Sequence, residues 1–152
     1  IPYQLDARRC IAYLTIEHKS SIPEALRALI GNRIFGCDDC QLVCPHNREP
    51  GHGDKIFSAR HGLDDVALLE LFCWSPSRFA ECTEGSAIRR LGYERWMRNL
   101  AVALGNGPSN EETIAALRSR LGAVSEMVDE HIYWALGRLV GESTVTNLED
   151  RS

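Results

Sequence analysis

The feature that most constrains this chain is a closely spaced set of three cysteines, Cys37, Cys40 and Cys44, with Pro45 directly after them. Their spacing, Cys-x2-Cys-x3-Cys-Pro, forms the last three quarters of the bacterial run that binds [4Fe–4S] clusters. In that run the closing cysteine ligates the other cluster of a two-cluster protein. The pattern therefore predicts iron–sulfur ligation shared between two clusters.

The missing first cysteine of the run falls at Ile34, whose side chain cannot bind iron. We expect Cys10 to supply the substitute thiolate. In this interpretation Cys10, Cys37 and Cys40 hold one cluster and Cys44 serves a second. The remaining ligands of both clusters would lie outside this sequence.

A structural zinc site is the alternative use of the same thiols. Zinc could be held by Cys10, Cys37 and Cys40 together with either Cys44 or His46. Zinc ribbons usually show two Cys-x2-Cys knuckles, whereas this chain has one knuckle followed by a Cys-Pro pair. The pattern thus favours iron–sulfur over zinc.

Disulfides are a weaker interpretation of the six cysteines, because four of them belong to one metal-binding pattern. The other two, Cys73 and Cys82, lie in stretches that we expect to be helical. Cys73 is predicted to be a small buried apolar side chain, and Cys82 to be the same although its flanks are more polar.

Composition sets broad limits on the function. The chain has 152 residues and a formal charge of −4, so binding to nucleic acid would need a local basic patch. It contains no apolar run of about 18 residues, which argues against a membrane span. The chain opens at Ile1 without an initiating Met, and we expect it to be the C-terminal portion of a longer cytoplasmic protein.

The sequence predicts a mainly α fold. We expect a helix over 5–17 with Asp6 as N-cap and Cys10 on it, and a second helix from Pro23 to Gly31. A short helical turn should follow over 38–43, and then a loop over 45–53. Beyond the loop we expect helices over 63–74, from Ser75, from Ser86 and over 111–121.

A short motif that occurs twice suggests a structural repeat in the last part of the chain. Residues 100–105 and 132–137 share an Ala-Leu-Gly ending at an offset of 32 positions, which is compatible with a HEAT-type solenoid or with an ordinary helical bundle. We therefore divide the chain into a partial ferredoxin-like [4Fe–4S] segment, residues 1–50, and an α-helical, HEAT-like domain, residues 51–152.

Three stretches, residues 5–17, 31–45 and 85–101, resemble the epoxyqueuosine reductase family. The resemblance implies a cobalamin-dependent reductase with two [4Fe–4S] clusters. Such an enzyme removes the epoxide oxygen of epoxyqueuosine at the tRNA wobble position and so forms queuosine. It also implies that Cys10 joins Cys37 and Cys40 on one cluster, with Cys44 on the other. His46 departs from the family, which more often has Trp there.

The resemblance also implies what this chain lacks. An upstream half would carry the cobalamin domain, the proton donor and the first cysteine quartet, so the fragment alone should be inactive and should contain no catalytic residue. The family enzyme is expected to be a monomer when full-length, and the sequence does not identify its electron donor.

Two groups of side chains are candidates for binding. Those after the Cys10 segment and after Cys44 could contact the cofactor: Thr15, Glu17, Lys19 and His46. Arginines interleaved with Tyr93 and Trp96 could bind tRNA: Arg89, Arg90, Arg95 and Arg98. The alternatives are a surface helix end for the first group, and a solvated helix face with Trp96 in the core for the second.

Two other functions remain open from the sequence. One is an electron-transfer module of another corrinoid enzyme, such as a reductive dehalogenase, because the bare Cys-x2-Cys-x3-Cys-Pro pattern is shared with such proteins. The other is a zinc-stabilised helical scaffold that binds partners and catalyses nothing. A basic surface beside the clusters favours the tRNA enzyme over the electron-transfer module. The metal content, zinc or iron, would distinguish the helical scaffold from the other two.

Overall fold

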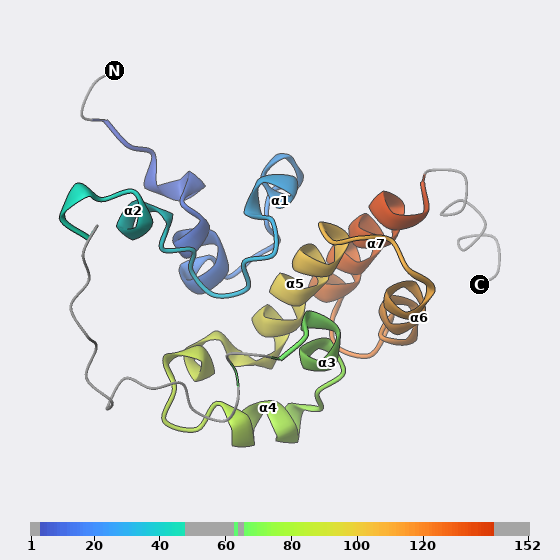
Figure 1. Ribbon diagram of the computed structural model, residues 1–152. Coiled ribbons are helices and arrows are strands. Elements are labelled where there is room, and N and C mark those ends of the chain that lie inside the picture. Colours follow the sequence, from blue (N-terminus) through green and yellow to red (C-terminus); the bar gives the residue numbers. More distant parts are fainter. Residues whose placement is uncertain (1–3, 48–62, 64–65, 142–152) are drawn as a thin grey trace.

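The computed structural model describes residues 4–47, 63 and 66–141, and no strand occurs among them, which confirms a mainly α fold. Figure 1 shows the arrangement of the elements. In chain order they are the 3-10 turn η1 (Ala7–Arg9), the π-helix η2 (Tyr13–Glu17), α1 (Glu24–Ile30), α2 (Asp39–Leu42), the 3-10 turn η3 (Pro45–Asn47), α3 (Leu68–Phe72), α4 (Pro76–Cys82), the 3-10 turn η5 (Ala87–Leu91), α5 (Gly92–Gly105), α6 (Glu111–Ser119) and α7 (Glu126–Val140).

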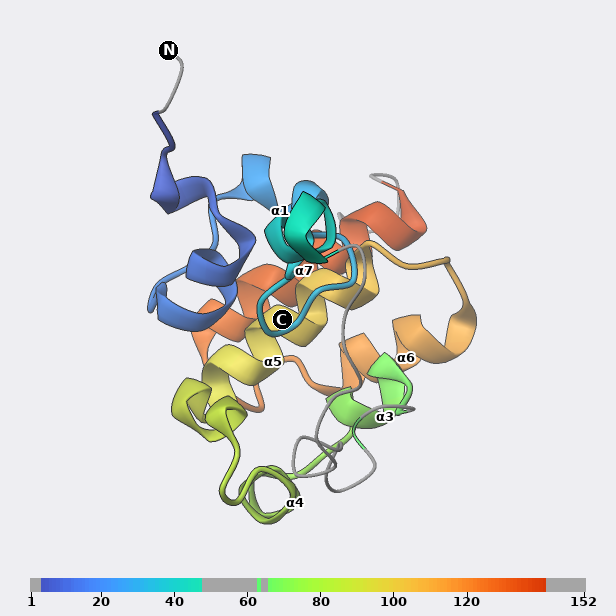
Figure 2. The ribbon, with the colours of Figure 1, turned by 60° about the vertical axis from the view of Figure 1, so that its left-hand side comes forward.

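The two longest helices, α5 and α7, lie side by side at the centre of the molecule (Figures 1 and 2). Leu100 of α5 and Ile132 of α7 are fully buried in the main hydrophobic core. At Gly105 a Cβ atom would lie only 2.8 Å from the Cα of Ala135, so glycine lets the two backbones approach closely. The HEAT-like repeat itself stays a prediction.

The shorter elements α3, α4 and η5 also pack against α5. Trp74, Phe79 and Trp96 form an aromatic cluster in which the Phe79 and Trp96 ring centroids are 5.5 Å apart. Cys82 is buried there as expected, but the prediction for Cys73 is wrong, because its thiol is exposed at the end of α3.

Local signals predicted several helix ends correctly. Ser75 and Ser86 act as N-caps, since the side chain of Ser75 accepts from Arg78 N and that of Ser86 accepts from Ile88 N. The helix after Pro23 ends at Gly31, which has a φ of 64°. The expected turn over 38–43 is α2. The helix expected over 63–74 is shorter, because α3 begins only at Leu68.

The predicted helix over 5–17 is broken at Cys10, whose backbone is extended (φ −69°, ψ 131°). Asp6 does act as an N-cap, accepting a hydrogen bond from Arg8 N, but it caps only η1. After the break, the Thr15 hydroxyl donates to the carbonyl of Ile11 at 2.7 Å. Such a bond competes with the regular backbone ladder, and here the turn is widened into a π-helix. Cys10 therefore lies at a junction and not on a helix.

The segment that carries Cys10 and Cys37 is attached to the helical scaffold by a second, smaller core. Leu14, Ile22 and Ile30 pack there against Val102 of α5. The expected boundary at residue 50, and most of the expected loop over 45–53, lie outside the described residues. The division into two domains stays a prediction.

His131 on α7 makes a polar connection to the same segment. Its Nε2 accepts a hydrogen bond from the backbone N–H of Ile22 at 3.1 Å, while its Nδ1 donates to Met127 O at 2.6 Å. The bond from Ile22 requires the neutral ring, because Nε2 can accept only when it carries no proton, whereas the bond to Met127 needs only the proton on Nδ1. Burial lowers the pKa of His131 from 6.5 to about 4.

This lowered pKa predicts an acid-sensitive fold. The contribution of neutral His131 to stability should be complete above pH 6.5 and should be lost as the pH falls from 6.5 to about 4. The loss should reach about 3 kcal/mol at most. Urea unfolding at several pH values should show this slope in the wild type and a flatter one in His131→Gln, which can accept from Ile22 N but does not titrate. Equal slopes in the two proteins would contradict the assignment.

Candidate functional site

All six cysteines are free thiols, and the four candidate ligands lie in irregular backbone or in the short helix α2. Cys10 is exposed at the junction between η1 and η2, and Cys40 is exposed on α2. Cys37 precedes α2 and Cys44 follows it, and both are half-buried. These soft sulfur donors suit an iron–sulfur cluster.

The turn that carries Cys37 is shaped by left-handed backbone on both sides of it. Gly36 has a φ of 67° and Asp38 a φ of 54°. Glycine adopts this conformation freely, and aspartate is among the few other residues that tolerate it. The start of α2 is then held by Arg33, whose Nη2 lies 2.8 and 3.0 Å from the two carboxylate oxygens of Asp39. The turn is therefore fixed by the chain's own residues.

One buried hydroxyl connects the Cys10 segment to the Cys37 segment. The Oγ1 of Thr15 donates to the carbonyl of Ile11, the residue after Cys10, at 2.7 Å. The same oxygen accepts from the N–H of Gly36, the residue before Cys37, at 2.9 Å. The backbones next to two of the predicted ligands of one cluster are thus hydrogen-bonded to a single atom.

The prediction that Thr15 contacts the cofactor is wrong, because its side chain is 0% exposed. Its role is internal to the loop. Glu17, Lys19 and His46 are exposed, so their predicted contacts stay predictions.

Two buried polar residues of α5 hold this segment in place. Asn99 Nδ2 donates to the carbonyls of Thr15 at 2.8 Å and Ile34 at 2.9 Å. The Arg98 guanidinium donates to Asn99 Oδ1 and to three further carbonyls, those of Leu14, His18 and Ser20. Sequence reasoning missed Asn99 altogether. The available signal was an adjacent polar pair within the otherwise apolar run of α5.

Arg98 is therefore not a tRNA ligand. Its side chain is 0% exposed, and its donors are used within the chain. Burial lowers its pKa to about 10, which still leaves it protonated at neutral pH.

Trp96 is excluded from base stacking, whereas the predicted tRNA contact of the half-buried Arg95 stays a prediction. Trp96 is 1% exposed in the core, so it cannot stack on a base. The three side-chain nitrogens of Arg95 donate to the carbonyls of Leu91, Ile16 and Arg90 at 2.6 to 2.8 Å. That geometry assigns Arg95 to holding η2 against η5.

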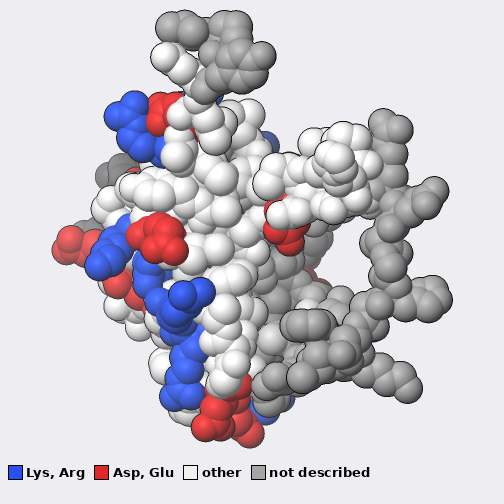
Figure 3. All heavy atoms as spheres, turned by 90° about the vertical axis from the view of Figure 1, so that its left-hand side faces the viewer, with Lys and Arg blue, Asp and Glu red and all other residues white. Residues whose placement is uncertain are grey.

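Arg89 and Arg90 are exposed on η5, the yellow-green turn before α5 in Figure 1. Among the described residues, neither guanidinium has a carboxylate within salt-bridge distance. Figure 3 shows the left-hand face of the molecule, on which Lys and Arg side chains form a broken column with acidic side chains at its ends. These two arginines remain candidates for phosphate contacts.

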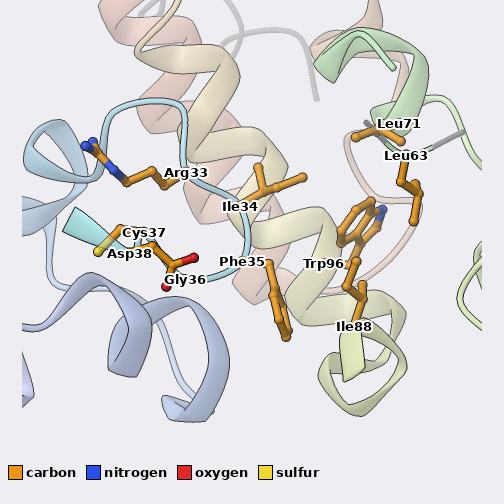
Figure 4. A pocket seen from close by; sticks show the side chains of 10 residues that line it. All are labelled: Arg33, Ile34, Phe35, Gly36, Cys37, Asp38, Leu63, Leu71, Ile88 and Trp96. Carbon is orange, nitrogen blue, oxygen red and sulfur yellow. The ribbon is translucent and has the colours of Figure 1, made fainter. Parts of the chain in front are cut away.

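A cavity of about 290 Å³ lies beside Cys37 (Figure 4). The residues that line it are Arg33, Ile34, Phe35, Gly36, Cys37, Asp38, Leu63, Leu71, Ile88 and Trp96. Among the described residues, the buried indole N–H of Trp96 has no hydrogen-bond partner. Small-molecule sites commonly measure roughly 300–1,000 Å³, so this cavity lies at the lower end of that range.

Within residues 4–47, 63 and 66–141, no three His, Cys, Asp or Glu side chains converge on one point as a single metal ion requires. The zinc alternative and the ligation of a cluster by the same cysteines both stay predictions. Nor is any helix in the described ranges long and apolar enough to cross a membrane.

Comparison with known proteins agrees with the thiol pattern. Residues 1–47, which contain all four candidate ligands, match the 4Fe-4S double cluster binding domain family. Epoxyqueuosine reductase of Pseudomonas aeruginosa is 61% identical over 140 residues, which cover 90% of this chain and 38% of the relative.

Solved structures give the same result. A selenomethionine-labelled epoxyqueuosine reductase aligns with a TM-score of 0.84 and 29% identity over 98% of this chain and 40% of its own. An epoxyqueuosine reductase with an epoxyqueuosine-modified tRNA-Tyr stem loop aligns with a TM-score of 0.81 and 28% identity, covering 91% of this chain and 37% of its own.

The family match of residues 1–47 and the helices define a mainly α protein with an iron–sulfur cluster-binding domain. Within this class, the chain belongs to the epoxyqueuosine reductase family, as its sequence suggested. It spans about 38% of the length of the Pseudomonas relative.

The buried position of Arg98 predicts a large cost for its removal. Arg98→Met should lower the free energy of unfolding by at least about 2 kcal/mol, because the carbonyls of Leu14, His18 and Ser20 would be left without donors. Arg89→Met, at an exposed site, should change it by less than about 0.5 kcal/mol. Urea unfolding of both variants measures the difference, and equal values would show that Arg98 does not hold the segment.

Proposed function

We propose that this chain is the cluster-holding portion of a longer epoxyqueuosine reductase that uses two [4Fe–4S] clusters and cobalamin to convert epoxyqueuosine to queuosine at the tRNA wobble position. The observation that carries the proposal is the Thr15 hydroxyl, which bonds the backbone beside Cys10 and the backbone beside Cys37. The match of residues 1–47 to a double-cluster family and the names of the relatives support it.

Cys10, Cys37 and Cys40 would ligate one cluster, and Cys44 the other, with the remaining ligands supplied by the rest of the protein. When bound, such clusters supply single electrons to the reaction. The contribution of this chain is to present the thiolates in a fixed turn, with Gly36 and Asp38 setting its backbone and Cys37 and Cys44 shielded in part from water.

Cobalamin would be bound mainly by other parts of the enzyme, and Glu17, Lys19 and His46 are the exposed side chains of this chain that could reach it. No catalytic group is assigned here, so the fragment alone should be inactive.

The proposed partner is tRNA that carries epoxyqueuosine. Arg89 and Arg90 lie on η5, which contacts η2 directly after the Cys10 junction, so phosphate contacts there would place nucleic acid near the clusters. A related enzyme has been solved with an epoxyqueuosine-modified stem loop, which supports this partner. A monomeric, cytoplasmic enzyme fits the proposal, since the thiols must stay reduced.

Metal analysis of the full-length protein, purified without oxygen, tests the ligand assignment. Cys10→Ala should lose about half of the iron and acid-labile sulfide, because one of two clusters loses a ligand. Cys73→Ala, which removes an exposed thiol outside the pattern, should keep the wild-type content. Zinc in place of iron, or full iron in Cys10→Ala, would refute the proposed ligation.

Binding across a salt series tests the tRNA surface. The double variant Arg89→Gln, Arg90→Gln should bind the tRNA more weakly and reduce the slope of log K against log salt by about 1.5, as expected for two lost phosphate contacts. Arg118→Gln, at an exposed arginine on α6, is the matched control and should keep both values. A slope unchanged in the double variant would remove these arginines from the interface.

A further inference from the structure

The buried Thr15 hydroxyl lies between two predicted ligands of one cluster without being able to touch the cluster. It has one hydrogen to donate, which goes to Ile11 O, and it accepts the Gly36 N–H. These partners are the immediate neighbours of Cys10 and Cys37 in the chain. A change in the separation of the backbones at Ile11 and Gly36 would stretch or break one of these two bonds.

The backbone of Thr15 is itself hydrogen-bonded to a buried side chain of α5. Its carbonyl accepts from Asn99 Nδ2 at 2.8 Å, and the same nitrogen donates to Ile34 O at 2.9 Å. Asn99 is 1% exposed, and its Oδ1 accepts from the Arg98 guanidinium at 3.0 and 3.1 Å. In Figure 4 the chain passes close to the helix that carries Trp96 at Ile34 and Phe35 and then leads away from it to Cys37. The backbone of Thr15, which carries the hydroxyl, is therefore hydrogen-bonded to helix α5.

The backbone of Gly36 needs a restraint, and the Thr15 hydroxyl supplies one. With a φ of 67°, the glycine can relax to many other conformations at little cost. A Cβ at this position would meet only Ile16 Cδ1 at 3.8 Å, so space does not restrain the residue. The bond from its N–H to Thr15 is the restraint that the structure shows.

We propose that Thr15 is a positioning residue that sets the separation of the Cys10 and Cys37 thiolates, and thereby controls how firmly their shared [4Fe–4S] cluster is retained and at what potential it is reduced. This inference rests on the proposed ligation by Cys10 and Cys37. Groups that orient metal ligands without touching the metal commonly change metal affinity by about 10- to 100-fold when they are removed.

Thr83 provides a matched control within the same chain. It is also 0% exposed, and its hydroxyl also donates to the carbonyl four residues earlier, Phe79 O, at 2.6 Å. Among the described residues, no backbone N–H from a distant loop donates to it. Thr83→Val therefore removes the same local bond as Thr15→Val but leaves the cysteine segments untouched.

The test uses the full-length holoprotein and measures the rate of iron release to a chelator, the midpoint potentials of the clusters and the thermal unfolding temperature. Thr15→Val should release the iron of one cluster at least about tenfold faster than the wild type and shift one potential. Thr83→Val should keep both values while losing some thermal stability, because it removes the local bond that Thr15→Val also removes. Thr15→Ser, which restores the hydroxyl, should return the release rate close to that of the wild type.

Equal iron release and unchanged potentials in Thr15→Val and Thr83→Val would overturn the inference alone, as would a serine variant that behaves like the valine variant. Absence of iron and sulfide from the wild-type holoprotein would overturn the proposed function and this inference with it. If Thr15→Val does not fold, Thr15→Ala and Thr83→Ala give the same comparison without a β-branched side chain.

Discussion

The hydrogen bonds of Arg98 and Asn99 attach the cysteine-bearing segment to the helical scaffold, and the arrangement of that segment depends on them. Both side chains are buried near the middle of α5 and donate to backbone carbonyls of Leu14, Thr15 and Ile34, among others. This segment has little regular secondary structure in which its carbonyls could pair. A buried carbonyl without a donor is costly, so side chains from α5 do what a helix or sheet would otherwise do.

The Arg98 guanidinium is unusual for a buried cation because backbone and side-chain carbonyl groups surround it. Arg27, the other buried arginine, pairs with Glu130, whereas in the described part of the chain Arg98 has no carboxylate within salt-bridge distance. Five donors in a planar fork can reach several carbonyls at once, which a lysine ammonium cannot do from one position. The need for many donors at fixed angles explains why an arginine, and not an apolar residue, occupies this place in the core.

What the sequence predicted well was local, and what it missed was long-range. The thiol spacing, the cap at Ser75 and the helix after Pro23 depend on residues a few positions apart, and the structure agrees with both helix starts. The burial of Thr15 and Arg98 depends on partners that are distant along the chain, since Arg98 and Leu14 are separated by 84 positions. A single sequence carries no direct signal of such pairings, so a buried arginine resembled an RNA-binding one.

The close packing of α5 against α7 at Gly105 has a consequence for electron transfer. Helices whose backbones nearly touch cannot slide or rotate without a clash, so α5 offers a stiff support to whatever it holds. The proposed thiolate frame is connected to that support through Asn99 and one hydroxyl. A frame that does not relax keeps the same shape in both oxidation states. Little protein rearrangement would then accompany the arrival or departure of an electron.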